Sequence, residues 1–180
     1  MLTAAASSPS QAPSSQVQKR VAKPPVIAGA LTVQLLEDPA QLAAITDECE
    51  RLASVTRPHL PFTTPQWLLH WWQHFRENRA LVRDRFFVHT LRDERGTLIV
   101  LEPLMLTERP AKGLLRLRSI SFFGADRNIT ELRGLICAPE HEALAARALL
   151  AHLTEHSAAW DSFAWDGLRQ GGEAYEMLDA

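Results

Sequence analysis

The sequence predicts a mixed α/β (α+β) fold, and three observations lead to this prediction. Several segments of four to ten residues are rich in alternating or continuous apolar residues, as β-strands are. Three longer segments carry apolar residues at helical spacing behind a capping signal. The composition, 46% hydrophobic and 22% charged, is that of an ordinary globular domain, and 180 residues suffice for one domain with a core.

Residues 1–30 differ from the rest of the chain. They are rich in Ala, Ser, Pro and Gln and nearly free of aromatic residues. Such a segment buries too little apolar surface to offset its conformational entropy. We therefore predict a disordered tail over 1–30 and a folded domain over 31–180.

The first predicted elements are a strand over 31–36, "LTVQLL", and a helix over about 39–54. Asp38 is a suitable N-cap, Pro39 a suitable first helical residue, and Gln41 completes a capping box. The apolar face of this helix consists of Leu42, Ile45, Cys49 and Leu52.

A second helix is predicted over about 65–77, within "PFTTPQWLLHWWQHF". Thr64 is its expected N-cap and Pro65 its first residue. One wide face carries Trp67, Leu68, Trp71, Trp72 and Phe75. Large aromatic side chains are costly to leave in water, so we interpret this face as core rather than as a platform for sugars or bases.

Three strands follow. Segments 85–91 and 97–106 flank the turn "RDERG" and predict a hairpin, and segment 114–123 follows the turn "RPAKG". The middle strand is apolar on both faces, which is typical of a covered sheet. Its faces are expected to carry Leu98, Val100 and Leu104 on one side and Ile99, Leu101 and Met105 on the other. Because proline cannot donate to the ladder, we predict a bulge or a splay beside Glu102 and Pro103.

The remaining elements are a short strand within 131–138, an Ala- and Leu-rich helix from Pro139 to about 155, and a strand over 160–168. A last helix is expected to begin in 173–180 and to be truncated, because few residues remain for it.

Several functional classes are disfavoured. The net charge of −2 and the lack of a basic stripe argue against nucleic-acid binding. No apolar run reaches the ~20 residues of a membrane span, and the N-terminus lacks a secretory signal, so we expect a cytoplasmic protein. Cys49 and Cys137 are the only cysteines, and a domain of this size does not need a disulfide.

Two histidine pairs have the spacing of metal ligands. His70 and His74 are four residues apart on the aromatic helix, and residues 152–156, "HLTEH", fit the H-x-x-E-H pattern. The first pair lacks the glutamate of zincins, and the second lies in the last turn of its helix, where histidines complement the dipole. We predict no metal site.

A cofactor candidate lies near the end of the sequence. Residues 169–174, "RQGGEA", match the short Q/R-x-x-G-x-G/A pattern of acyl-CoA pyrophosphate loops through Arg169, Gly172 and Ala174. The segment falls between a predicted strand and a predicted helix start, where backbone N–H groups can hold a phosphate. The alternative is an ordinary glycine-rich turn.

Four segments together resemble the N-terminal part of the CelD/BcsL-type bacterial acetyltransferases associated with cellulose biosynthesis, a branch of the GNAT superfamily. They are 61–75, "PFTTPQWLLHWWQHF"; 96–106, "GTLIVLEPLML"; 117–128, "LRSISFFGADRN"; and 158–168, "AAWDSFAWDGL". The resemblance implies a GNAT-like, mostly antiparallel twisted sheet flanked by helices. It also implies acetyl-CoA or another acyl-CoA as cofactor of the intact protein, and a second, C-terminal GNAT-like fold that holds most of the cofactor site.

Two functional hypotheses follow from the resemblance. The first is the N-terminal half of an acyltransferase that moves an acyl group from acyl-CoA to an amine or hydroxyl acceptor, with exopolysaccharide or cellulose metabolism as the setting that the resemblance implies. Glu102, beside the expected bulge, is its candidate catalytic base, and the alternative for this residue is an exposed strand carboxylate. The second hypothesis is a non-catalytic domain that docks onto a C-terminal GNAT-like domain or a partner protein and has no acyl-CoA site of its own.

Overall fold

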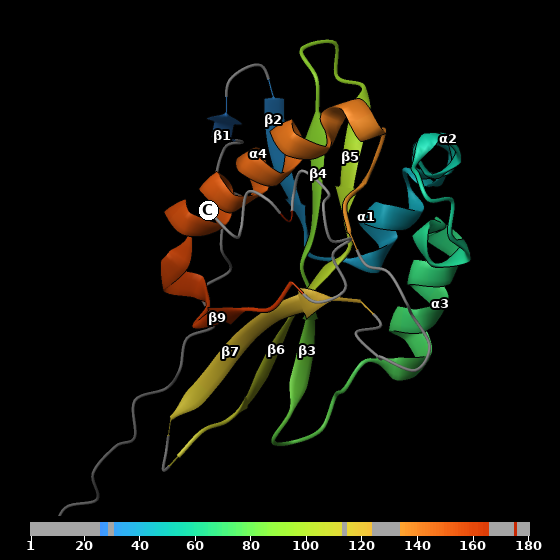
Figure 1. Ribbon diagram of the computed structural model, residues 1–180. Coiled ribbons are helices and arrows are strands. Elements are labelled where there is room, and N and C mark those ends of the chain that lie inside the picture. Colours follow the sequence, from blue (N-terminus) through green and yellow to red (C-terminus); the bar gives the residue numbers. More distant parts are fainter. Residues whose placement is uncertain (1–25, 29–30, 113–114, 124–133, 166–174, 176–180) are drawn as a thin grey trace, which may run out of the picture.

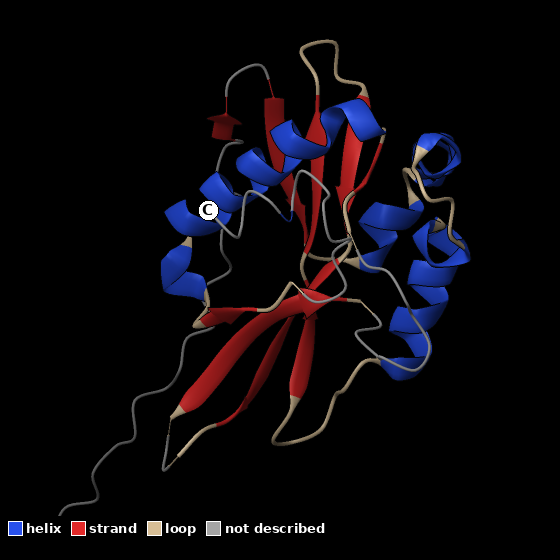
Figure 2. Cartoon of the chain, viewed as in Figure 1, coloured by secondary structure: helices blue, strands red, loops and turns tan. Residues whose placement is uncertain are grey.

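A computed structural model describes residues 26–28, 31–112, 115–123, 134–165 and 175. It has the predicted mixed α+β architecture, with two mostly antiparallel sheets and flanking helices (Figure 1, Figure 2). Among the described residues, no helix is long and apolar enough to cross a bilayer. The short strand β1 (Val26–Ala28) falls within the predicted tail, and the other tail residues lie outside the described ranges.

The larger sheet has five strands and the smaller one four. The order in the larger sheet is β1 (Val26–Ala28), β2 (Leu31–Leu36), β4 (Val88–Arg92), β5 (Leu98–Glu102) and β8 (Ile136–Cys137), with every neighbouring pair antiparallel. The order in the smaller sheet is β3 (Arg83–Phe86), β6 (Leu104–Pro110), β7 (Arg116–Phe122) and β9 (Ser162–Phe163). Among the strands that the structure describes, the β7–β9 pair alone is parallel.

Helices cover the larger sheet on both sides. On one side lies α4 (Glu142–Glu155), and on the other lie α1 (Pro39–Ala43), α2 (Thr46–Val55) and α3 (Pro65–Phe75) (Figure 1). Short 3-10 turns occupy Pro61–Thr63, Pro139–His141 and Ser157–Ala159. The expectation that the middle strand lies inside a covered sheet is therefore confirmed: all of β5 except Ile99 is buried.

The first helical segment begins as predicted but is divided. The Oδ1 of Asp38 accepts from the Ala40 amide at 2.8 Å, and the Gln41 side chain accepts from the Asp38 amide at 3.1 Å, which completes the capping box. The single helix predicted over 39–54 is instead two helices, α1 and α2, because Ile45 leaves the helical conformation.

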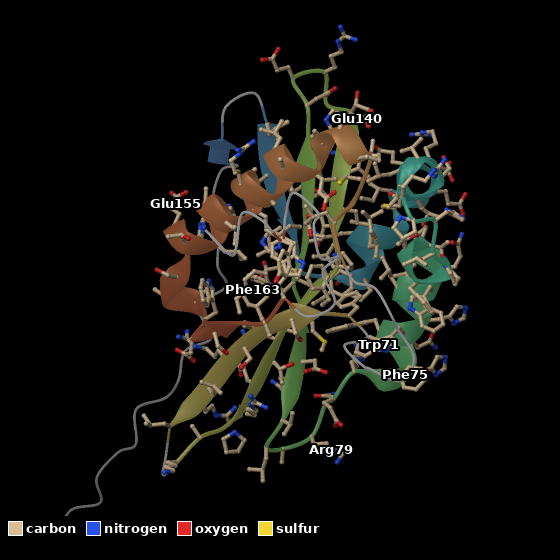
Figure 3. The ribbon with its side chains drawn as sticks, viewed as in Figure 1. Trp71, Phe75, Arg79, Glu140, Glu155 and Phe163 are labelled. Atoms are coloured by element: carbon tan, nitrogen blue, oxygen red, sulfur yellow. The ribbon has the colours of Figure 1, made fainter. Side chains whose placement is uncertain are left out.

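Helix α3 supplies part of the core, as its aromatic face predicts. The Oγ1 of Thr64 accepts from the Trp67 amide at 3.4 Å, and Trp72 is only 4% exposed. The Trp72 ring meets Phe86 edge-on at 5.0 Å between centroids. Phe75 is the exception: at the last position of α3 it is 61% exposed, so its predicted place in the core is wrong (Figure 3).

One long hairpin runs through both sheets. Its first arm consists of β3 and β4, interrupted only by Phe87, and its second arm consists of β5 and β6, interrupted only by Pro103. The register is the same on both sides of the interruption, with Phe86 opposite Met105 and His89 opposite Glu102. The Phe87 amide donates to the Leu104 carbonyl at 3.2 Å, so the two arms stay paired beside Pro103 while they pass from one sheet into the other. The bulge or splay predicted there is therefore not found between these two arms.

The register shift occurs further along the same hairpin. Leu91 is opposite Val100, but Arg92 is opposite Leu98, so Ile99 is an extra residue on β5. Because an extra residue reverses the alternation of side chains, Leu98 packs on the α1–α3 side while Val100 packs on the α4 side. The predicted grouping of Leu98 with Val100 and Leu104 is therefore wrong at Leu98, and Ile99 likewise joins the α4 side.

Helix α4 lies in the chain between β7 and β9, the two parallel strands of the smaller sheet, and β8 of the larger sheet comes between β7 and α4. The segment that leaves α4 is held by Arg118 on β7, which makes a two-pronged contact with Asp161 at 2.9 and 3.2 Å. The Arg118 amide also donates to Asp161 at 2.7 Å. Of the strand predicted over 160–168, the described residues 160–165 form strand β9 only at Ser162–Phe163, and residues 166–168 lie outside the described ranges. The helix expected in 173–180 also lies outside them apart from residue 175.

Candidate functional site

Glu102 is the last residue of β5, directly before Pro103, and its side chain is completely buried. It alternates with Val100 and Leu104, which pack in the core beneath α4. The alternative of an exposed strand carboxylate is therefore wrong. A carboxyl group therefore lies among the apolar side chains of the middle strand.

His89 on β4 is the residue directly opposite Glu102 in the ladder. Side chains of directly opposed residues lie on the same face of a sheet, with Cβ atoms ~4.5–5.5 Å apart. The His89 side chain is also completely buried. Within the described ranges, neither ring nitrogen of His89 and neither carboxyl oxygen of Glu102 has a hydrogen-bond partner.

Burial shifts the protonation of both groups toward their neutral forms. It raises the pKa of Glu102 well above the ordinary value of 4.5. It also lowers the pKa of His89 from 6.5 to about 3, and the nearby His152 and His156 add to this effect. Both shifts favour the neutral forms, a carboxylic acid and an uncharged imidazole, because neither charged form is solvated there.

Three further side chains border the pair. The ring of Phe87 meets His89 edge-on at 4.7 Å between centroids, and His152 on α4 does so at 5.2 Å. Cys137 on β8 is opposite Val100, two residues before Glu102. Burial raises the pKa of the Cys137 thiol, and the neighbouring Glu102 carboxyl raises it further. Cys137 is a free thiol and so is Cys49, which is buried on the other side of the sheet.

This arrangement can donate and accept protons. An unpartnered buried donor or acceptor costs about 1–3 kcal/mol, so two such side chains facing one another are expensive for a fold to keep. Neutral carboxyl and imidazole groups held in apolar surroundings are the elements of general acid–base chemistry. The pair also lies beside Pro103, where the hairpin passes from one sheet to the other.

The other sequence-based candidates have different positions. His70 and His74 are exposed on α3 with their rings stacked at 6.1 Å, remote from Glu102 in the fold. His152 and His156, at the end of α4, are brought next to His89. In the described parts of the chain, no three His, Cys, Asp or Glu side chains form a group that could hold a metal ion. The cofactor candidates Arg169, Gly172 and Ala174 lie outside the described residues.

Sequence reasoning missed His89. The signal that could have found it is the alternation in "RFFVHTL", in which His89 shares a face with the apolar Leu91. A polar residue in the buried register of a strand needs a partner or a purpose.

Comparisons with known proteins do not add to this geometry. A scan against protein-family models and a search of curated proteins both gave no match to the chain.

Proposed function

We propose that this chain is a GNAT-like half of an acyl-CoA-dependent acyltransferase, in which Glu102 is the catalytic base that activates an amine or hydroxyl acceptor. The observation that carries the proposal is the buried pair of Glu102 and His89, whose side chains have no hydrogen-bond partner among the described residues, at the point where one hairpin passes from one sheet to the other. Perturbed carboxyl groups are concentrated at functional sites. Because the donor is acyl-CoA, the proposal includes a cytoplasmic location and, from the resemblance, a role in exopolysaccharide or cellulose metabolism.

The topology supports the same proposal. The chain order of a strand, helices, antiparallel strands, α4 and a strand parallel to β7 fits the first GNAT-like fold that the sequence resemblance implies. A second GNAT-like fold would supply most of the acyl-CoA contacts.

In the proposed reaction, the Glu102 carboxylate takes a proton from the acceptor nitrogen or oxygen. The acceptor attacks the thioester carbonyl carbon, whose oxygen is stabilised by a backbone N–H. The carbon–sulfur bond then breaks, and the CoA thiolate leaves and takes up a proton. A raised pKa makes Glu102 a stronger base once it is ionised, although it lowers the ionised fraction at neutral pH.

One observation favours a second candidate function. A base must reach its substrate, and the Glu102 side chain has no exposed surface. If that burial persists in the working protein, the chain is a docking or scaffold domain, and the buried pair is a feature of its core alone. In that case the chain binds a partner protein or a C-terminal GNAT-like domain and no acyl-CoA.

Calorimetry with acetyl-CoA, followed by an acyl-transfer assay with amine acceptors, separates these two functions. We expect measurable binding by the chain, weaker than that of a protein that also carries the second GNAT-like fold, and loss of that binding in Gly172→Asp if the 169–174 segment holds the pyrophosphate. Glu102→Gln should retain binding and lower the transfer rate by roughly 10²–10⁴-fold. Glu108→Gln, on the neighbouring strand β6, is the control and should leave the rate unchanged. A folded chain that neither binds acetyl-CoA nor transfers the acyl group would refute the catalytic role and leave the docking role.

A further inference from the structure

Three histidine side chains form a row that leads from Glu102 toward the end of α4. The inner one, His89, is opposite Glu102 in the β4–β5 ladder. Its ring is 5.2 Å from the ring of His152, and the ring of His152 is 4.3 Å from that of His156, measured between centroids. The side chain of His89 is completely buried, whereas those of His152 and His156 are half-buried. The row therefore leads from the core toward solvent.

The outer histidine has a defined tautomer. The Nδ1 of His156 lies 2.8 Å from the backbone carbonyl oxygen of His152. Because a carbonyl oxygen can only accept, the Nδ1 of His156 carries a proton and donates it. The Nε2 of His156 is therefore the nitrogen that gains and loses a proton.

The two ends of the row lie in different surroundings. His152 is in the last turn of α4 and His156 caps it, so both lie at the negative end of the helix dipole. His89 is completely buried, and burial lowers its pKa, which favours the uncharged ring.

We infer that His89, His152 and His156 are a proton path that connects the buried Glu102 carboxyl to solvent. Glu102 gives its proton to one nitrogen of His89, and the other nitrogen of His89 releases a proton to His152. His152 passes one on in the same way to Nε2 of His156, which gives it to water. The net change is one proton moved from the carboxyl group to solvent, and the path runs in reverse when Glu102 is reprotonated.

Neighbouring rings exchange a proton when their nitrogens come within hydrogen-bond distance, either by rotation of the half-buried His152 or through an intervening water. The inference rests on the proposed function for its purpose, since Glu102 can act as a base only if its proton can leave. The proton movement itself is independent of any acyl group.

Other titratable side chains surround this path. Cys137 on β8 is coupled electrostatically to Glu102, and Glu140 and Glu142, at the start of α4, act on Cys137. Figure 3 labels Glu140 and Glu155 near the two ends of α4, and the histidine row lies toward the Glu155 end. Every variant compared below keeps Glu140 and Glu142 unchanged.

The test is a rapid pH jump on the intact chain, followed by infrared absorption of protonated carboxyl groups. The band that Glu102→Gln removes identifies Glu102, and its rate of loss after a jump to alkaline pH is the measurement. We expect His152→Gln to slow that loss by roughly 100-fold, as removal of a positioned proton carrier does. His156→Gln should slow it as well, since it removes the exit to water.

His141→Gln is the matched control, because His141 is the residue before α4 at its opposite end, roughly 20 Å from His156 along the helix axis. In this variant the Glu102 carboxyl band should disappear at the wild-type rate after the pH jump. If His152→Gln does not fold, judged by tryptophan fluorescence, the half-exposed His156→Gln decides the question.

Equal rates in the wild-type, His156 and His141 chains would overturn the proton path, and so would the absence of a carboxyl band that depends on Glu102. These outcomes are distinct from a failure of the proposed function. A chain with no acyl-transfer activity can still show the histidine-dependent rate, and an active enzyme can lack it.

Discussion

Replacing Glu102 with glutamine should make the protein more resistant to unfolding at alkaline pH than the wild type. The raised pKa of Glu102 means that the folded state keeps a proton that the unfolded state has released. This contribution to stability is fully present below pH 4.5, the ordinary value, and is lost progressively as the pH rises toward the folded pKa. Glutamine has nearly the same shape and does not ionise, so the variant lacks this loss.

The size of the effect follows from proton linkage. The free energy of unfolding of the wild type should fall relative to that of Glu102→Gln by about 1.4 kcal/mol for each pH unit in that window. His89 contributes with the opposite sign. Its pKa is lowered from 6.5 to about 3, so its contribution is present above pH 6.5 and lost as the pH falls. The two slopes oppose one another between pH 4.5 and 6.5, where the pair predicts a plateau of stability.

Urea unfolding followed by tryptophan fluorescence, at a series of pH values from about 5 to 8, measures the difference between wild type and variant. Taking the difference removes the contributions of groups that the two chains share. Glu94→Gln, exposed in the β4–β5 turn, is the control and should run parallel to the wild type. A difference that does not change with pH would show that Glu102 ionises as easily in the folded chain as in the unfolded one, and the account of a neutral buried pair would fail.

Two further predictions concern stability alone. Trp72→Ala should lower the free energy of unfolding by about 3–5 kcal/mol. Phe75→Ala, on the same helix but 61% exposed, should change it by less than about 0.5 kcal/mol. Similar urea midpoints for the two variants would contradict the assigned burial. Gly96→Ala should lower the free energy of unfolding by about 1 kcal/mol, because Gly96 has a φ of 78°. Gly134→Ala, with equally open space around its Cβ position, should leave the free energy of unfolding unchanged. Thermal unfolding of the two glycine variants side by side checks this, and equal melting temperatures would count against the backbone explanation.

The features that could be predicted from sequence are those fixed by residues close together in the chain. The capping box of Asp38 and Gln41 sets the start of α1, and Thr64 with Pro65 sets the start of α3. The hairpin turn was likewise marked by Gly96. Each of these signals acts over a few residues, so no knowledge of the tertiary structure is needed to recognise it.

The features that could not be predicted depend on pairing with distant segments. The extra residue at Ile99, which moves Leu98 to the other face, is set by the register of β5 against β4. The candidate site divides in the same way: Glu102 could be singled out from the sequence, but its burial depends on α4 and β8, more than 30 residues further on. His89 enters the site only because the ladder places it opposite Glu102.

The hairpin that supplies β3 and β4 on one arm and β5 and β6 on the other also governs how the protein can open. Amide protons on the two sides of Phe87 belong to different sheets, yet they lie on one continuous pair of strands. In native-state hydrogen exchange, segments that open together share a common free energy of opening. The shared arms leave no boundary at which either sheet could come apart as a separate foldon, so the amides of β4 and of β6 should exchange with the same free energy.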